Sequence, residues 1–179
     1  MVDLQLTVLG CATPYPAADN PCSGYLVTSG AADRLAGFLT NGPRRSPIES
    51  AFEITELYDG QTATVGGVEL TSRAVEHGLP AFGVRVEGAG RSLVYSGDTA
   101  PCAALSELAD GCDVLLCEAG GDDPAHHTAE QAGDSAAGAG RLIVTHVARP
   151  IAPAEAAARA ATRYDGPVEY AVPGATYRM

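Results

Sequence analysis

Apolar and polar residues alternate with a period of two along much of the first half of the chain. This alternation is the signature of a half-buried strand. It predicts strands over residues 4–10, 24–28, 51–57, 63–75, 81–88 and 91–97. Gly66 and Gly67 interrupt the run over 63–75 and predict the turn of a β-hairpin. Residues 32–39 have a short helical pattern, and residues 40–50 are rich in turn-forming residues.

Helical and strand patterns alternate in the second half of the chain. Helices are predicted over residues 101–110, 128–139 and 152–164, and strands over 113–119, 141–146 and 168–172. The strands at 113–119 and 141–146 are apolar on both faces, so helices must cover the sheet there. The fold class expected from this pattern is a layered α/β protein, with residues 1–179 in a single domain.

Charge and cysteine usage narrow the classes of function. The net charge is −11, and the 11 basic residues are all scattered arginines, which argues against a nucleic-acid partner. Five cysteines without a C-x-x-C pair argue against a disulfide framework and against a thiolate zinc site. The sequence has neither an apolar run of membrane-spanning length nor a signal-peptide pattern. We therefore expect a cytoplasmic protein without a membrane partner.

Polar side chains stand at the ends of four predicted strands. These residues are His77, Asp98, Glu118 and His146. A further pair, His126 and His127, precedes a predicted helix. Imidazole and carboxylate groups that converge from separate strands can bind Zn²⁺. Each residue alone also fits an ordinary structural role, such as a turn aspartate or a hydrogen-bonded histidine.

The order of several blocks resembles that of a known family. "VLGCATPYPAADNPCSGYLV", "AVEHGLPAFGVRVE", "LVYSGDT", "LLCEAG", "HHTAEQAG" and "RLIVTHVARP" occur as in the metallo-β-lactamase superfamily. They are most similar to its ribonuclease Z-like branch of small bacterial hydrolases. The resemblance implies an αββα sandwich, with His77 and His146 as ligands of two zinc ions and Asp98 bridging them. It also implies that Asp98 and His126 are catalytic, His126 by assisting the leaving group.

The chain departs from the family at its metal-binding motif, H-x-H-x-D-H, which does not occur in the sequence. Compared with the family, the stretch is missing near residues 29–33, so we expect a truncated sandwich. His77, Asp98 and His146 then remain as metal ligands, enough for one zinc ion or none, with manganese or iron as alternatives. The sheet surface uncovered by the loss would be covered by residues 40–50 or by a second copy in a homodimer. A natural gene deletion, an engineered deletion and a sequence record that lacks the stretch would each produce this junction.

Two functions from different classes follow. The first is a metal-dependent hydrolase of a small ester, lactone or phosphodiester. The alternative is a catalytically inactive pseudo-enzyme, a remnant that binds a small ligand. RNA is not expected as a substrate, because the short interval between Asp98 and His126 leaves no room for the exosite arm of a tRNA-processing enzyme and contains Asp122 and Asp123.

Overall fold

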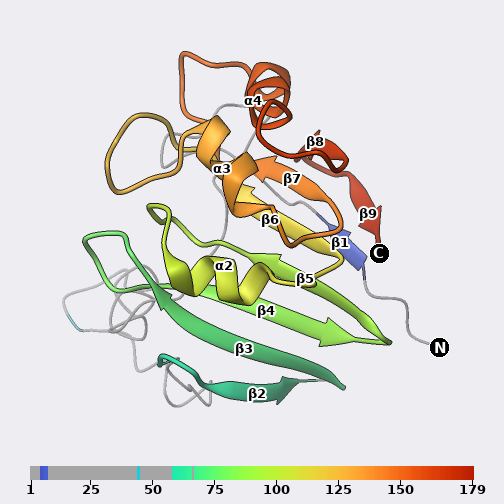
Figure 1. Cartoon of the computed structure of the whole chain (residues 1–179). Coiled ribbons are helices and arrows are strands. Elements are labelled where there is room, and N and C mark those ends of the chain that lie inside the picture. Colours follow the sequence, from blue (N-terminus) through green and yellow to red (C-terminus); the bar gives the residue numbers. More distant parts are fainter. Residues whose placement is uncertain (1–4, 8–43, 45–57, 66) are drawn as a thin grey trace.

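The computed structural model describes residues 5–7, 44, 58–65 and 67–179 (Figure 1). Within these residues, seven strands form one sheet in the order β2-β3-β4-β5-β6-β7-β8. Their bounds are β2 (Thr62–Val65), β3 (Val68–Val75), β4 (Ala81–Gly88), β5 (Arg91–Tyr95), β6 (Val114–Glu118), β7 (Leu142–Thr145) and β8 (Val168–Tyr170). A separate antiparallel pair joins β1 (Gln5–Thr7) to β9 (Thr176–Arg178).

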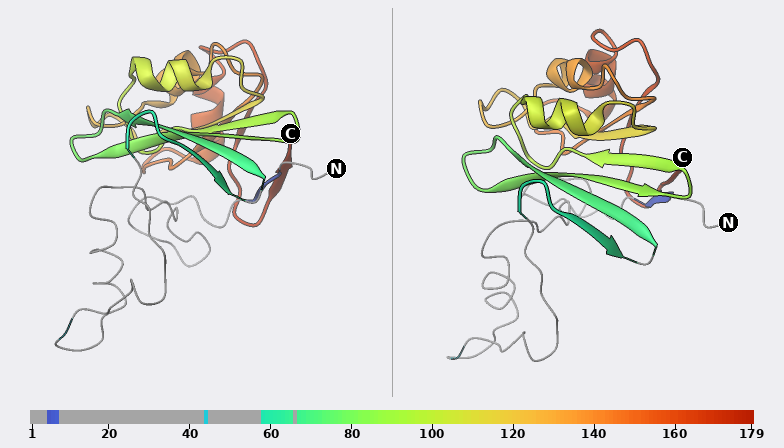
Figure 2. Two further views of the ribbon diagram at one scale, coloured as in Figure 1. Left: turned by 90° about the horizontal axis from the view of Figure 1, so that it is seen from below. Right: turned by 60° about the horizontal axis from the view of Figure 1, so that its bottom comes forward.

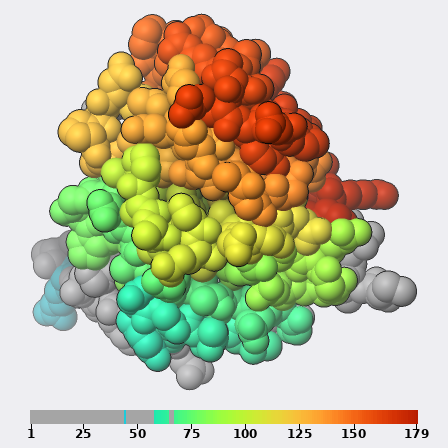
Figure 3. Space-filling view, viewed as in Figure 1, coloured from blue at the N-terminus to red at the C-terminus, as the bar shows by residue number. Residues whose placement is uncertain are grey.

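The sheet has an antiparallel half and a parallel half. Strands β2 to β5 pair antiparallel, whereas β5 to β8 pair parallel. Each parallel connection carries a helix: α2 (Ala103–Ala109), α3 (Ala129–Ser135) and α4 (Pro153–Ala160). These helices lie on the same side of the sheet (Figure 2), as consistent crossover handedness requires. In the space-filling view the residues of these helices occupy the upper and middle part of the visible face, and those of β2 and β3 are exposed below them (Figure 3).

Local sequence explains where the helices start. Thr128 and Gln131 form a capping box at α3, in which each backbone N–H donates to the side chain of the other residue, at 2.8 and 3.2 Å. Helix α4 begins with Pro153, whose fixed φ suits the first helical position, and has Glu155 in its first turn. Arg159 lies in the last turn of the same helix, where its positive charge is stabilised by the negative end of the helix dipole.

The hydrophobic core lies on both faces of the parallel strands. Every residue of β6 and β7 is buried, as expected for strands covered on two sides. On the helix side, Leu105, Leu115 and Leu142 belong to one apolar cluster. On the opposite side, Ile143 belongs to a second cluster, against which Tyr177 of β9 packs. The strand ends between these clusters are therefore held by packing from both faces.

The predicted α/β class is confirmed, and so are the strands and helices expected from residue 63 onward. Helix α3 ends earlier than the predicted span 128–139, because residues 136–140 form turns and bends, and α4 ends earlier than the predicted span 152–164, because residues 161–163 form turns. Strand β9 was not predicted. Among the described cysteines, Cys102, Cys112 and Cys117 are free thiols, as expected. No helix among the described residues has the length and apolarity needed to cross a membrane.

Several predictions lie outside the described residues. These are the strands at 24–28 and 51–57, the helix at 32–39, the covering segment at 40–50 and the apparent deletion near 29–33.

The predicted hairpin is present as β2 and β3, with Val65 opposite Val68. Gly67 has a positive φ of 83° in its turn.

Candidate metal centre

Asp98, His126 and His146 come together at one edge of the sheet. One potential ligand atom from each residue lies within 4.8 Å of the others. His146 Nε2 is 3.8 Å from Asp98 Oδ2, and the His126 and His146 rings are stacked with centroids 5.8 Å apart. Asp98 and His146 were expected together as ligands, whereas His126 was expected to assist catalysis and now joins the same group.

The parallel strands explain this convergence. Asp98 follows β5 and His146 follows β7, and the carboxyl ends of parallel strands meet at one edge of a sheet. Gly97 fits the turn before Asp98 because its φ is +66° and a Cβ there would lie 2.6 Å from the carbonyl oxygen of Phe82. A side chain at this position would displace the loop that carries Asp98.

His77 lies beside this three-residue group. Its ring meets the ring of His126 edge to face, with centroids 4.8 Å apart. Its Nδ1 is 3.2 Å from the carbonyl oxygen of Ala125, which can only accept a hydrogen bond. Nδ1 therefore donates, and Nε2 is left with a lone pair, the form in which histidine binds a metal. The role of His77 as a metal ligand stays a prediction.

Glu118, the last residue of β6, is fully buried and contacts His126. His126 Nδ1 is 2.9 Å from each of its carboxylate oxygens. The backbone N–H groups of Thr99 and Gly120 donate to Glu118 at 2.7 and 2.8 Å. Burial raises the pKa of Glu118 to about 8, although these N–H donors favour its charged form. The carboxylate orients the His126 ring and leaves Nε2 for a ligand or a substrate.

His146 has an unusual backbone for a residue other than glycine, with φ of +50°. Conformations of this kind cluster at functional sites, where the surrounding structure enforces them. Burial lowers the pKa of His146, as do the neighbouring His126 and His77, while Asp98 acts in the opposite direction. The neutral imidazole is thereby favoured, and this is the form that binds metal ions.

The chemistry of the three residues fits a metal ion. Two imidazoles and one carboxylate are the protein ligands of many catalytic zinc sites, which keep a fourth position for water. Zinc ligands lie about 2.0–2.2 Å from the ion, so small side-chain rotations would bring atoms within 4.8 Å of one another onto one ion. The hydrogen bond from His126 to Glu118 is the outer contact that metal-binding histidines usually make.

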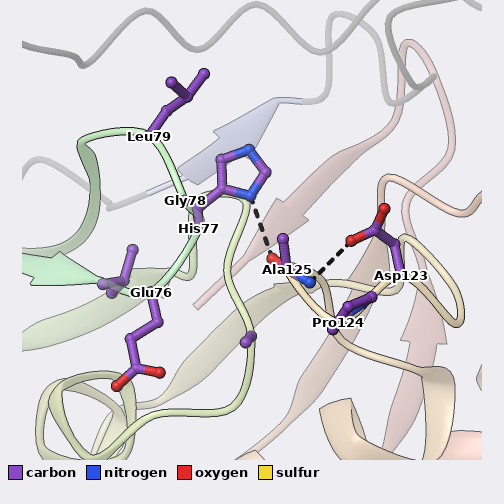
Figure 4. Close-up of a pocket in the computed structure, with 9 residues that line it drawn as sticks. Glu76, His77, Gly78, Leu79, Asp123, Pro124 and Ala125 are labelled. Atoms are coloured by element: carbon purple, nitrogen blue, oxygen red, sulfur yellow. Dashed lines mark hydrogen bonds between the residues drawn. The ribbon is translucent and has the colours of Figure 1, made fainter.

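A cavity of about 580 Å³ is lined by His77, while Asp98, His126 and His146 are not among its lining residues. It lies between the loop after β3 and the loop before α3, and its walls include Glu76, Leu79 and Asp123 (Figure 4). The figure shows His77 hydrogen-bonded to Ala125 at the boundary between the two loops. The cavity therefore offers space for a small molecule beside His77.

His127 is a buried residue of the site that sequence reasoning did not assign. It is fully buried, and burial lowers its pKa. Its position directly after His126 in the "HHT" stretch was the available signal. Its contacts depend on the path of two loops, which a sequence pattern does not specify.

Comparison with known proteins assigns the chain to a family. A family model described as "Beta-lactamase superfamily domain" matches residues 18–147. The chain belongs to this superfamily, and its fold is the metallo-β-lactamase type. The resemblance seen in the sequence is thus confirmed.

Two curated relatives bear on the branch of the superfamily. An uncharacterized protein of Mycobacterium leprae is 36% identical over 135 residues, covering 70% of this chain and 48% of that protein. A ribonuclease Z of a Mycobacterium species is 35% identical over 138 residues, covering 65% of this chain and 48% of that enzyme. The chain thus spans about half the length of these relatives.

Solved structures agree on the fold. The metallo-beta-lactamase fold protein YhfI from Bacillus subtilis superposes with a TM-score of 0.77 and 19% identity, covering 98% of this chain and 99% of that one. A diphosphatase of the PhnP family superposes with a TM-score of 0.63 and 18% identity, covering 88% of this chain and 60% of that one. At these identities the likeness concerns the fold alone.

Proposed function

We propose that the chain is a metal-dependent hydrolase that cleaves a small phosphodiester. The observation that carries this proposal is the convergence of Asp98, His126 and His146, with Nδ1 of His126 held by the buried Glu118. The similarity to a ribonuclease Z supports phosphodiester chemistry, with carboxylic esters and lactones as alternative substrates. The expected metal is zinc, with manganese or iron as alternatives.

Each residue of the centre has a distinct task in this proposal. Asp98 and His146 would hold the ion together with a histidine, which is His126 by the geometry or His77 by the resemblance. When bound, the metal lowers the pKa of water and polarises a phosphoryl oxygen. Asp98 orients the attacking water by accepting a hydrogen bond from it. If His77 completes the ligand set, a protonated His126 donates its proton to the leaving oxygen as the P–O bond breaks.

The acidic surroundings favour a small substrate over RNA. Glu76 and Asp123 line the cavity beside His77, and the net charge of the chain is −11. A polyanion would be repelled, since nucleic-acid binding depends on neutralising several phosphates with basic side chains. A small ester carrying one or no negative charge would not suffer this repulsion to the same extent.

The experiment combines metal analysis with a hydrolysis assay. Purified protein is titrated with Zn²⁺, Mn²⁺ or Fe²⁺ and assayed with bis-p-nitrophenyl phosphate and p-nitrophenyl acetate. We expect close to one bound ion per chain and metal-dependent release of nitrophenol, both lost in Asp98→Asn. Asp165→Asn, which changes an exposed aspartate after α4, is the matched control and should leave both unchanged. Absence of metal binding by the wild type would overturn the proposal.

The inactive pseudo-enzyme is the second candidate, and the missing H-x-H-x-D-H motif favours it. A binding protein of this kind would keep its fold and its cavity without turnover. In the same assay it would bind a metal ion or a phosphodiester without releasing nitrophenol. Turnover that disappears in Asp98→Asn, with the fold retained, would exclude it.

A further inference from the structure

His127 connects two loops that carry residues of the metal centre. Its Nδ1 lies 2.6 Å from the carbonyl oxygen of Thr99, and its Nε2 lies 3.0 Å from Ser135 Oγ in α3. A carbonyl oxygen only accepts, so Nδ1 carries the proton. Nε2 of the neutral ring then accepts a hydrogen bond from the Ser135 hydroxyl. The ring is thus fixed at both nitrogens, with no exposed surface.

The hydrogen bond from His127 to Thr99 matters because Thr99 also contacts Glu118. Thr99 follows Asp98 directly and is itself fully buried. Its carbonyl accepts from His127, while its backbone N–H donates to Glu118 at 2.7 Å. Glu118 in turn accepts from Nδ1 of His126, the residue that precedes His127. Thr99, Glu118, His126 and His127 therefore form a closed circuit beside Asp98.

The circuit links the position of Asp98 to that of His126 by two routes. The first route runs from the Thr99 N–H through the Glu118 carboxyl group to the His126 ring. The second route runs from the Thr99 carbonyl through the His127 ring to the backbone next to His126. An apolar side chain could fill the volume of His127 without the cost of burying two polar nitrogens. An apolar side chain could not donate a hydrogen bond to the Thr99 carbonyl, as His127 does.

We propose that His127 is a positioning residue that sets the spacing between the Asp98 carboxylate and the His126 imidazole. Its effect on turnover rests on the proposed function. The spacing itself is a property of the metal-free chain and can be measured without activity. Ser135 contacts the opposite nitrogen of the ring, and the positioning effect is assigned to the Thr99 contact alone.

Two amide substitutions separate the two ends of the His127 ring. In His127→Asn the side-chain amide takes the place of Nδ1 and can still donate to Thr99. In His127→Gln the amide reaches the place of Nε2, so it can meet Ser135 but not Thr99. Both variants lose one contact and introduce a similar buried amide. Their difference therefore reports the Thr99 contact rather than general damage to the core.

The variants are compared in two measurements. Hydrogen exchange of the Thr99 backbone N–H in the metal-free protein should be near the wild-type rate in His127→Asn and at least tenfold faster in His127→Gln. Zn²⁺ affinity should fall about tenfold to a hundredfold in His127→Gln, the usual effect of losing an outer contact of a metal site, with kcat following and KM little changed. His127→Asn and Ser135→Ala should stay within a few-fold of the wild type.

The result that overturns the inference is equal exchange at Thr99 in the two amide variants, whether both are slow or both are fast. His127 would then be an ordinary buried residue. The proposed function fails in a different way, through a wild-type protein that binds no metal ion. In that case the exchange rates still decide whether His127 holds the loop of Asp98.

Discussion

His126 donates from Nδ1 to the carboxylate of Glu118, with both carboxylate oxygens at 2.9 Å. The acceptor is buried at the end of β6, and the donor belongs to the loop before α3. The pair therefore fixes a loop residue to the rigid centre of the sheet. A histidine held in this way has one defined nitrogen directed away from the carboxylate.

Replacing Glu118 by glutamine should weaken the centre without unfolding the protein. Glutamine keeps the shape and one carbonyl acceptor, but an N–H₂ donor replaces the second carboxyl oxygen, which the Gly120 N–H and the His126 ring contact. We expect metal affinity and kcat to fall by about tenfold to a hundredfold, as for other outer contacts of metal ligands. Metal titration and steady-state kinetics measure this. Glu69→Gln, at an exposed position in β3, is the control and should behave as the wild type.

Gly120 should tolerate no side chain. A Cβ there would lie 2.5 Å from Glu118 Oε2 and 2.7 Å from His126 Nδ1, so Gly120→Ala would push the two residues apart. We expect loss of metal binding comparable to that of Glu118→Gln, with a stability cost of about 1–3 kcal/mol from overpacking. Gly88→Ala is the control, because the nearest atom to its Cβ would be at an ordinary 3.4 Å. Equal metal affinity in the two alanine variants would contradict this account.

Hydrophobic patterning was sufficient for the elements around the core. Strands β6 and β7 are apolar on both faces, and that property alone required helices over the sheet. Strand β9 escaped prediction because Thr176–Arg178 is short and its pairing with β1 joins opposite ends of the chain. Alternation in sequence is local, whereas this pairing is set by tertiary structure.

The candidate site was predictable to the extent that it depends on strand ends. Asp98 and His146 could be placed together because parallel strands end at one edge. The position of His126 in the same group depends on the path of the loop before α3, which carries no periodic signal. Glu118 stood out as a polar strand end, but its hydrogen bond to His126 required the three-dimensional arrangement.

Asp113 should make stability depend on acid pH at a place far from the candidate chemistry. It is partly buried, which by itself raises its pKa, but hydrogen bonds from Arg91 and from the Ser92 backbone and hydroxyl outweigh this and lower the pKa. A carboxyl whose pKa is lower when folded stabilises the protein above its unfolded pKa of about 3.9. That stabilisation is lost as the pH falls through the folded value.

We therefore expect Asp113→Asn to be less stable than the wild type at pH 7, and the difference to shrink below about pH 4. Urea unfolding at a series of pH values measures it. Asp165→Asn, at an exposed position, should follow the wild-type curve throughout. A difference between Asp113→Asn and the wild type that stays constant down to pH 3 would show that charge is not the cause.

His146 allows a test that separates backbone strain from metal binding. Its φ of +50° is tolerated by asparagine but disfavours a β-branched residue by about 1–2 kcal/mol. We expect His146→Asn to unfold at a higher urea concentration than His146→Val, while both lose metal binding at least tenfold because neither offers an imidazole. Urea unfolding and metal titration of the two variants give the two quantities independently. If His146→Val were as stable as His146→Asn, the left-handed backbone would not be a constraint, and if either bound metal like the wild type, His146 would not be a ligand.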